Sequence, residues 1–359
     1  STELTKRRCS FIPIELIEID VPDAPISKLI TWLPLKRKNN DFKSLDWKGN
    51  SEKLICTHPN DPAILDTMVN MISSAKRYVF LFNWMLDYPL IEKSLVTAAN
   101  RLNGRVHVLT TLETSIHSRY SDEEESMNNL SRLQELAGNG VYIRLHSEAH
   151  AKFLIVDDEL LVTSANIRDT SLERNIETGL RVNDSDTVNS FHSFFSYLWL
   201  HETDQHIRPS KIDPRLGNPW SQAEVPSPPS AMANAIWTLD NRRMSLVNAI
   251  IDIIRNAKKT LRISTYVLSN VESGIGKQVV DELVNASNKG VAITILYHAT
   301  DMAIGRLPRE HEAEGFLRLM SCKGVSVRGH PHLHAKHAIA DGKSGLLFTA
   351  NLDGNHGLN

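Results

Sequence analysis

Two short segments combine the residue types that phosphoryl transfer requires. His150–Asp157 and His334–Asp341 share the pattern His-x-Lys-x4-Asp. Alternate side chains of a strand point to one face, so each histidine is expected to project together with its lysine, Lys152 or Lys336. A lysine disfavours a neighbouring imidazolium, and two such pairs facing each other need an anion or acidic groups to balance their charge. A phosphodiester fits, because lysines can hold its non-bridging oxygens while the histidines act along the P–O axis.

The two motifs belong to a longer internal duplication. Equivalent motif residues lie 184 positions apart, as do the strand-like segments Gly140–His146 and Gly324–His330. Strands that alternate with helices are typical of parallel βαβ units covered on both faces. We therefore predict an α/β fold with two pseudo-symmetric βαβ lobes, in which mixed sheets are flanked by helices. The expected helices are 61–75, 123–136, 244–257 and 311–321, and the other expected strands are 77–82, 105–110, 260–267 and 291–297.

A proline-rich stretch separates the two copies. Six prolines lie between Ile207 and Met232, a composition typical of a linker. The predicted organisation is an N-terminal elaboration over residues 1–60, a first lobe over 61–206, a linker over 207–240 and a second lobe over 241–359. Within the N-terminal elaboration, the partly alternating segment Phe11–Asp20 is a candidate edge strand.

The composition describes a globular chain without an extreme charge. Its 359 residues include 40 Lys and Arg against 42 Asp and Glu, which gives a net charge of −2 and a pI near 6.7. This balance argues against a broad polyanion-binding surface but permits a local basic site. Cys9, Cys56 and Cys322 lie too far apart to indicate a disulfide framework or a zinc site. Without a membrane-length apolar run or a signal-peptide pattern, a cytoplasmic location is expected.

The paired motifs resemble those of the phospholipase D superfamily. Thr163–Asn166 and Asn175–Glu177, downstream of the first motif, add to the resemblance, which covers about residue 61 to the end of the sequence. It implies two lobes whose motifs meet at a pseudo-two-fold axis, so that one chain forms the site without a second subunit. It also implies a covalent phosphohistidine intermediate that needs neither a metal nor another cofactor.

The resemblance gives each motif residue a role. His150 would be the nucleophile and His334 the acid and base, although the symmetry of the two copies leaves the reverse open. Asp157 and Asp341 complete the catalytic motifs but are expected to hold the fold locally. The residues that would bind phosphoryl oxygens are Lys152, Lys336, Asn166 and Asn351, together with Ser164 and Thr349.

In this family a carboxylate after the motif orients the histidine through its second ring nitrogen. Glu177 matches this role for His150. For His334 the equivalent strand and carboxylate would lie beyond Asn359. We therefore expect residues outside this sequence to complete the second half-site.

Other candidate site residues are weaker. His330, His332 and His334 alternate and could share a strand face that binds zinc, but Pro331 interrupts the strand and Lys336 would repel a cation. We therefore expect no metal. Trp84 lies in an apolar context, as do Trp199 and Trp237, and is expected to belong to the core.

The motifs do not select between a nucleic acid and a phospholipid as substrate. The slightly negative net charge argues against a nuclease, whereas the lack of a membrane span or a basic amphipathic helix argues against a lipid enzyme. On balance the sequence favours a nuclease that hydrolyses DNA or RNA. The alternative is a phospholipase D or phosphatidyltransferase. Two intact motifs argue against a non-catalytic binding module.

Overall fold

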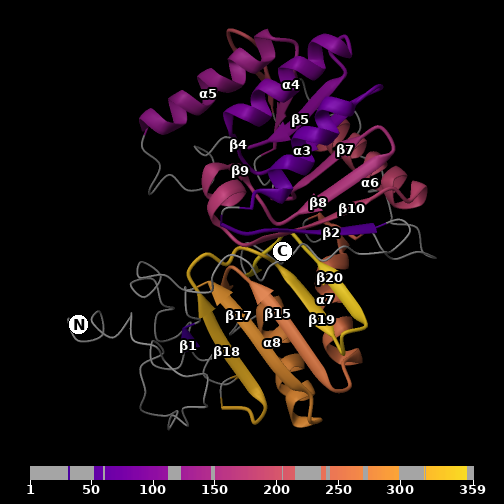
Figure 1. Cartoon of the computed structure of the whole chain (residues 1–359), viewed down its shortest axis with the longest axis vertical. Helices are drawn as coiled ribbons and strands as arrows, with labels where there is room; N and C mark the ends of the chain where they lie inside the picture. Colours follow the sequence, from indigo (N-terminus) through magenta and orange to yellow (C-terminus); the bar gives the residue numbers. More distant parts are fainter. Residues whose placement is uncertain are drawn as a thin grey trace.

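The computed structural model describes residues 31–32, 52–59, 61–111, 123–146, 150–203, 205–214, 236–239, 243–269, 274–298, 319 and 321–353. These residues build two sheets, each with its own helices (Figure 1). The expected strand Phe11–Asp20, nearly all of the helix expected at 311–321, and most of the linker lie outside the described residues.

The first lobe contains a nine-stranded mixed sheet. In spatial order its strands are β12 (Ile212–Pro214), β11 (Gln205–Ile207), β6 (Tyr142–Leu145), β5 (Val106–Thr110), β3 (Val79–Phe82), β7 (Phe153–Val156), β8 (Glu159–Thr163), β10 (Glu177–Val182) and β2 (Glu52–Thr57). The strands β3, β5 and β6 run parallel. On the other side of β3, the strands β7, β8, β10 and β2 continue the sheet in antiparallel pairs.

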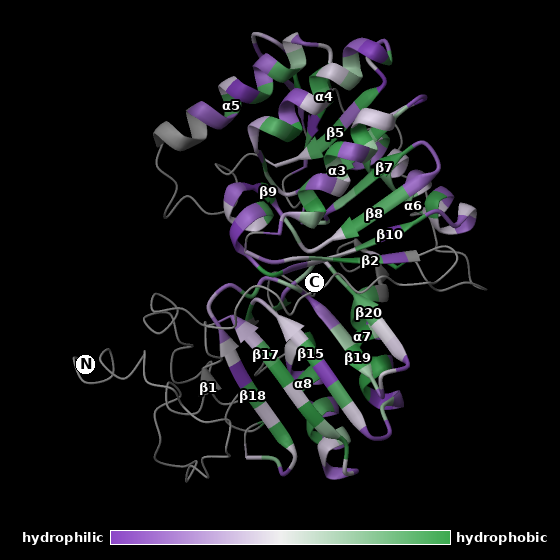
Figure 2. Cartoon of the chain, viewed as in Figure 1, coloured by the Kyte–Doolittle hydropathy of each residue, from purple (hydrophilic) through white to green (hydrophobic). Residues whose placement is uncertain are grey.

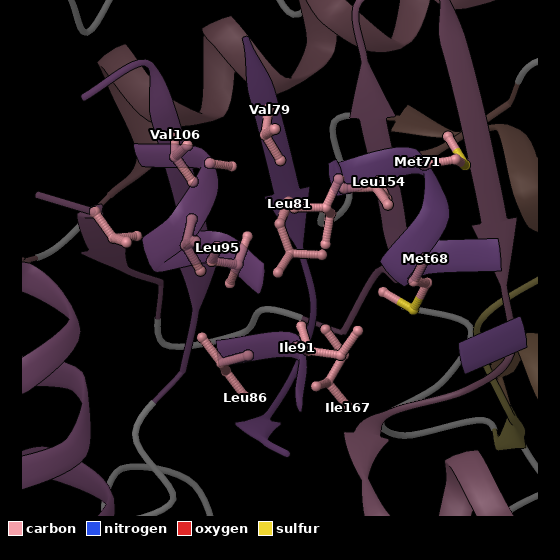
Figure 3. Close-up of a cluster of buried hydrophobic side chains, with 14 of the residues drawn as sticks. Met68, Met71, Val79, Leu81, Leu86, Ile91, Leu95, Val106, Leu154 and Ile167 are labelled. Atoms are coloured by element: carbon pink, nitrogen blue, oxygen red, sulfur yellow. The ribbon is translucent and has the colours of Figure 1, made fainter. Parts of the chain in front are cut away.

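Helices cover both faces of this sheet. One apolar core lies under α3 (Ala63–Ser74), α4 (Pro89–Arg101) and α5 (Glu123–Gly138), and a second lies under α6 (Ser185–Tyr197). Figure 3 shows the first core, where Met68 of α3 and Leu95 of α4 pack near Leu81 of β3. All four residues of β7 are buried, and Figure 2 colours β7 as strongly apolar. Burial on both faces fixes β7, and with it the motif residues that precede it.

The second lobe repeats this arrangement with a six-stranded sheet. Its strands, in spatial order, are β1 (Thr31–Trp32), β18 (Val325–His330), β17 (Ala292–His298), β15 (Thr260–Thr265), β19 (His337–Ala340) and β20 (Ser344–Leu347). The helices α7 (Ser245–Asn256) and α8 (Gly274–Asn288) pack on this sheet around one core. The order β6-β5-β3-β7-β8 recurs as β18-β17-β15-β19-β20, which confirms the predicted pair of α/β lobes.

Short elements complete both lobes. In each lobe a pair of two-residue strands joins two loops, namely β4 after β3 with β9 after β8 in the first lobe, and β16 after β15 with β21 after β20 in the second. The bounds of the remaining elements are β4 (Leu86–Asp87), β9 (Ile167–Arg168), β16 (Leu268–Ser269), β21 (Leu352–Asp353), β13 (Thr238–Leu239), β14 (Arg243–Met244) and the π-helical turns η4 (Thr170–Arg174) and η5 (Leu198–Glu202).

The edges of the sheets differ from the predicted boundaries. The strand β2, which falls in the predicted N-terminal elaboration, pairs along its whole length with β10 of the first lobe. The hairpin of β11 and β12 extends that lobe's sheet past residue 206, into the predicted linker. The two-residue strand β1 pairs with β18 of the second lobe. Short edge strands carry weak periodicity, which explains why the sequence did not reveal them.

Candidate active site

Both motifs lie at the carboxyl edge of the parallel strands. Phe153 at the start of β7 pairs with Phe82 at the end of β3, and His337 at the start of β19 pairs with Ser264 near the end of β15. The histidines and lysines directly precede β7 and β19, so they lie at this edge. The strands β8 and β20 return to the same edge, which brings Asn166 and Asn351 there. In open α/β sheets this edge is where ligands bind.

A backbone junction joins the first lobe to the second motif. The N–H of Ile176 donates to the carbonyl of His332 (2.7 Å), and the N–H groups of His334 and Ala335 donate to the carbonyl of Ile176 (3.0 and 2.8 Å). Glu177 follows Ile176 directly. The junction therefore places the carboxylate of Glu177 next to the motif of the second lobe.

Glu177 orients His334 rather than His150. Its Oε1 lies 2.7 Å from Nδ1 of His334, and the carboxylate is fully buried. The predicted pairing of Glu177 with His150 is therefore wrong, and so is the expectation that the partner of His334 lies beyond Asn359. The reason is that Ile176, directly before β10, is hydrogen-bonded to the second motif region. A proton on Nδ1 that faces Glu177 leaves Nε2 of His334 available for substrate.

Ser164 supports this carboxylate. Its hydroxyl donates to Oε2 of Glu177 and accepts from the N–H of Thr178 (3.0 Å). Ser164 is fully buried. Its predicted role in phosphate binding is therefore wrong, because both functions of the hydroxyl are already used. Thr349, at the equivalent position of the second lobe, is half-buried, and its role stays a prediction.

The two motif lysines are fully buried. The Nζ of Lys152 donates to the carbonyl of His150 (2.6 Å), and the Nζ of Lys336 donates to the carbonyl of His334 (2.7 Å). Burial, followed by the charge of Lys336, holds the pKa of Lys152 well below its usual value. Burial lowers the pKa of Lys336 to about 8, with Glu177 opposing the shift. A bound anion would therefore stabilise the protonated form of each lysine.

The environments of the two histidines differ. Burial, together with the charges of Lys152 and Lys336, holds the pKa of His150 well below its usual value. Burial and Lys336 also lower the pKa of His334, but Glu177 opposes that shift. Burial tends to raise the pKa of Glu177, yet His334 and Lys336 outweigh it, so its pKa is lowered. His150 is therefore the more readily neutral histidine, and His334 the one that better retains a proton.

Asn166 and Asn351 have unsatisfied side chains at the same edge. The Oδ1 atoms of both are buried, and neither finds a hydrogen-bond partner within the part of the chain that the structure describes. A side-chain amide can turn over to present its NH₂ group to a phosphoryl oxygen. Their predicted contact with phosphate remains a prediction, and a buried polar group without a partner supports it.

The two motif aspartates lie at the opposite ends of the strands. The carboxylate of Asp157 accepts from the N–H groups of Lys76, Arg77 and Tyr78 at 2.8 to 3.1 Å. Asp341 makes the equivalent three bonds to residues 258–260. Both residues have positive φ, at the turn that follows β7 or β19. Their place in the catalytic motif is therefore structural, as the sequence led us to expect.

Asp157→Asn is expected to weaken folding without affecting the chemistry. Burial opposes ionisation, but three backbone N–H groups outweigh it and lower the pKa of Asp157. A carboxylate whose pKa is lowered by folding stabilises the folded state at pH values above its unfolded-state pKa. This stabilisation is lost as the pH falls through the folded-state pKa. Denaturant titrations should show a loss of about 1–2 kcal/mol at pH 7 that shrinks below about pH 4. Asp158 is exposed, so the control variant Asp158→Asn should change the free energy of unfolding little. An equal loss of stability in this control would contradict the stabilising role of Asp157.

Two aromatic residues at the site were not predicted. The ring centroid of Trp84 lies 6.1 Å from that of His150, and the ring centroid of Tyr266 lies 4.8 Å from that of His334. Both residues are half-buried, so the assignment of Trp84 to the core is wrong. The available signal was the repeat itself, because Trp84 lies two residues after the end of β3 and Tyr266 lies one residue after the end of β15.

Neither a metal site nor a membrane span is found among the described residues. His330 and His332 have ring centroids 6.1 Å apart, yet no group of three His, Cys, Asp or Glu side chains in the described ranges could hold a metal ion. Independence from metal stays a prediction. None of the helices built by these residues combines the length and apolar character needed to cross a bilayer.

Comparisons with known proteins agree with this geometry. The family model described as "Cardiolipin synthase, PLD-like domain" matches residues 68–199 and 250–356, one segment in each lobe. No curated protein sequence matches significantly.

One solved structure shares the fold at low sequence identity, and a second resembles less than half of this chain. Phosphatidylserine synthase from Haemophilus influenzae Rd KW20 is 12% identical over 81% of this chain and 76% of its own, with a TM-score of 0.51. The phospholipase D family member Nuc from Salmonella typhimurium is 19% identical over 44% of this chain and 99% of its own, with a TM-score of 0.37. Because the family model matches more than half of the sequence, the chain belongs to the phospholipase D superfamily.

Proposed function

We propose that this protein is a phosphodiesterase that hydrolyses nucleic acid through a phosphohistidine on His150. The buried charge carries the proposal. Lys152 and Lys336 are fully buried, and Glu177 is the single buried carboxylate among the residues that the structure describes. With both lysines protonated, one positive charge is unbalanced while His334 is neutral, and two are unbalanced when His334 is protonated for the first step. A phosphodiester carries a single negative charge at neutral pH, and it would offset one of them.

The first chemical step uses both histidines. Neutral His150 attacks phosphorus through a ring nitrogen, and the bond between phosphorus and the leaving oxygen breaks. Protonated His334 gives its Nε2 proton to that oxygen, while its Nδ1 proton stays on the contact with Glu177 (2.7 Å). Lys152 and Lys336 hold the non-bridging oxygens, where negative charge concentrates in the transition state.

The second step reverses the role of His334. A water molecule attacks phosphorus, neutral His334 takes the proton of that water, and the bond between phosphorus and His150 breaks. The products are an alcohol from the first step, a phosphomonoester from the second, and the protein in its starting protonation state. Only side chains of this chain hold or move protons in either step.

Nucleic acid is the proposed substrate because of the rings beside the histidines. Trp84 and Tyr266 are half-buried aromatic rings of the kind on which bases stack, although the ring of Tyr266 also contacts His298, with centroids 4.5 Å apart. The alternative is a phospholipase D or phosphatidyltransferase acting on phospholipid headgroups. The name of the matching family, which refers to cardiolipin synthase, favours this alternative, as does the fold shared with a phosphatidylserine synthase.

A substrate panel in the presence of EDTA tests the proposal. We expect the native protein to cleave end-labelled single-stranded DNA or RNA under these conditions. Strict dependence on a divalent metal would contradict the metal-free mechanism. Release of choline or phosphatidic acid from phosphatidylcholine vesicles, with no cleavage of single-stranded or duplex nucleic acid, would instead establish the lipid alternative.

A further inference from the structure

The aromatic residues beside the two histidines are related by the internal repeat. The backbone N–H of Lys76 donates to Asp157, and that of Lys258 makes the equivalent bond to Asp341. Lys76 and Lys258 are therefore equivalent positions of the repeat, 182 residues apart. The same separation relates Trp84 to Tyr266. Each half of the site therefore contributes one histidine, one lysine and one aromatic ring.

Hydrogen bonds order the backbone that carries both rings. The carbonyl of Trp84 accepts from the N–H of Thr111 and the hydroxyl of Thr110, both at 3.4 Å, which ties it to the end of β5. Beside Tyr266, the hydroxyl of Thr265 donates to the carbonyl of Val267 (2.7 Å) and accepts from the N–H of Leu352 (3.3 Å). Ordered backbone makes these rings suitable for binding, since little freedom is lost when a ligand stacks on them.

The arrangement of the two rings indicates what they bind. Each ring lies beside one of the two histidines, and the Nζ of Lys336 lies 5.6 Å from the ring centroid of Tyr266. Aromatic rings bind nucleobases as well as quaternary ammonium groups such as choline. A nucleic-acid phosphodiester carries one base on each side, which matches two rings, whereas phosphatidylcholine carries a single choline.

We propose that Trp84 and Tyr266 stack the two bases that flank the cleaved phosphodiester, one on each side, so that the substrate is single-stranded nucleic acid. In a duplex the bases already stack on one another, and exposing them requires unpairing and unstacking. The inference rests on the proposed nuclease function and adds the strandedness and the binding residues. Nucleotides without bases would still meet the histidines and lysines but would bind without stacking.

Dinucleotides with a single phosphodiester provide the test. Four substrates are compared by kcat/KM: thymidylyl-thymidine, the same compound without the 5′-side base, without the 3′-side base, and without both. For the native protein, loss of either base is expected to lower kcat/KM by about 10- to 100-fold. In Trp84→Ala one of these two effects should disappear, and in Tyr266→Ala the other. Trp84→Phe and Tyr266→Phe should restore them.

A matched control and distinct outcomes separate the inference from the proposed function. Tyr142 is 48% exposed on β6, and Tyr142→Ala should leave both base effects intact. Cleavage of dinucleotides with equal base effects in the native protein and in both alanine variants would overturn the stacking role while the nuclease function stands. Turnover of phosphatidylcholine vesicles without any cleavage of the dinucleotides would overturn both.

Discussion

Alanine in place of His150 is expected to abolish the covalent intermediate and to lower kcat by at least about 10³-fold. We expect no replacement by His334, because Glu177 opposes the lowering of its pKa and the first step uses it as the acid. Rapid quenching in alkaline SDS, which preserves the acid-labile phosphohistidine bond, should reveal a ³²P-labelled protein for the native sequence after reaction with a labelled diester and none for His150→Ala. His206→Ala, on the strand β11 between β6 and β12, is the matched control and should retain both label and turnover.

His334→Ala is expected to fail at a different step. With a p-nitrophenyl ester of thymidine phosphate, the leaving group needs no proton, so attack by His150 should still proceed. Hydrolysis of the intermediate requires a base, so labelled protein should accumulate after one burst of p-nitrophenol. Accumulation in His150→Ala and not in His334→Ala would mean that the roles of the two histidines are reversed.

The central part of the site could be predicted because its signals are local. The spacing of each motif follows the two-residue period of a strand, and the 184-residue repeat shows that both copies occupy the same place in a lobe. Pairing of β7 with β3 and of β19 with β15 then brings the histidines and lysines to the carboxyl edges. The rest depends on how the lobes pack, which no local pattern encodes.

Glu177 and Ser164 illustrate this limit. Glu177 lies 27 positions after His150 in the sequence, yet the junction at Ile176 places it against His334. Ser164 follows the first motif as a phosphate-binding hydroxyl would, but its side chain is used by Glu177 and Thr178. Trp84 has apolar neighbours in the sequence because β3 is buried, although it lies just past the end of that strand. Only the three-dimensional structure places such residues.

Glu177→Gln is expected to lower kcat by roughly 10²- to 10⁴-fold while leaving the fold intact. The amide has the shape of the carboxylate but lacks the charge that stabilises protonated His334 and Lys336. Glu177 raises the pKa of His334 against the effect of burial, so its loss lowers that pKa further. Because His334 must be protonated in the first step, the alkaline limb of the kcat/KM profile should move to lower pH in the variant.

The charge of Glu177 also predicts which step of the reaction suffers. Substrates whose leaving group needs a proton should be affected most. The fraction of native activity that Glu177→Gln retains should therefore be far larger with the p-nitrophenyl ester than with a dinucleotide. Glu173, exposed on η4, offers a matched control, and Glu173→Gln should change neither the ratio nor the pH profile. A Glu177→Gln profile that superimposes on the native one, at equally reduced rates for both substrates, would show that the carboxylate maintains only the packing between the lobes. A shift confined to Glu177→Gln would show that a strand of the first lobe tunes the acid of the second.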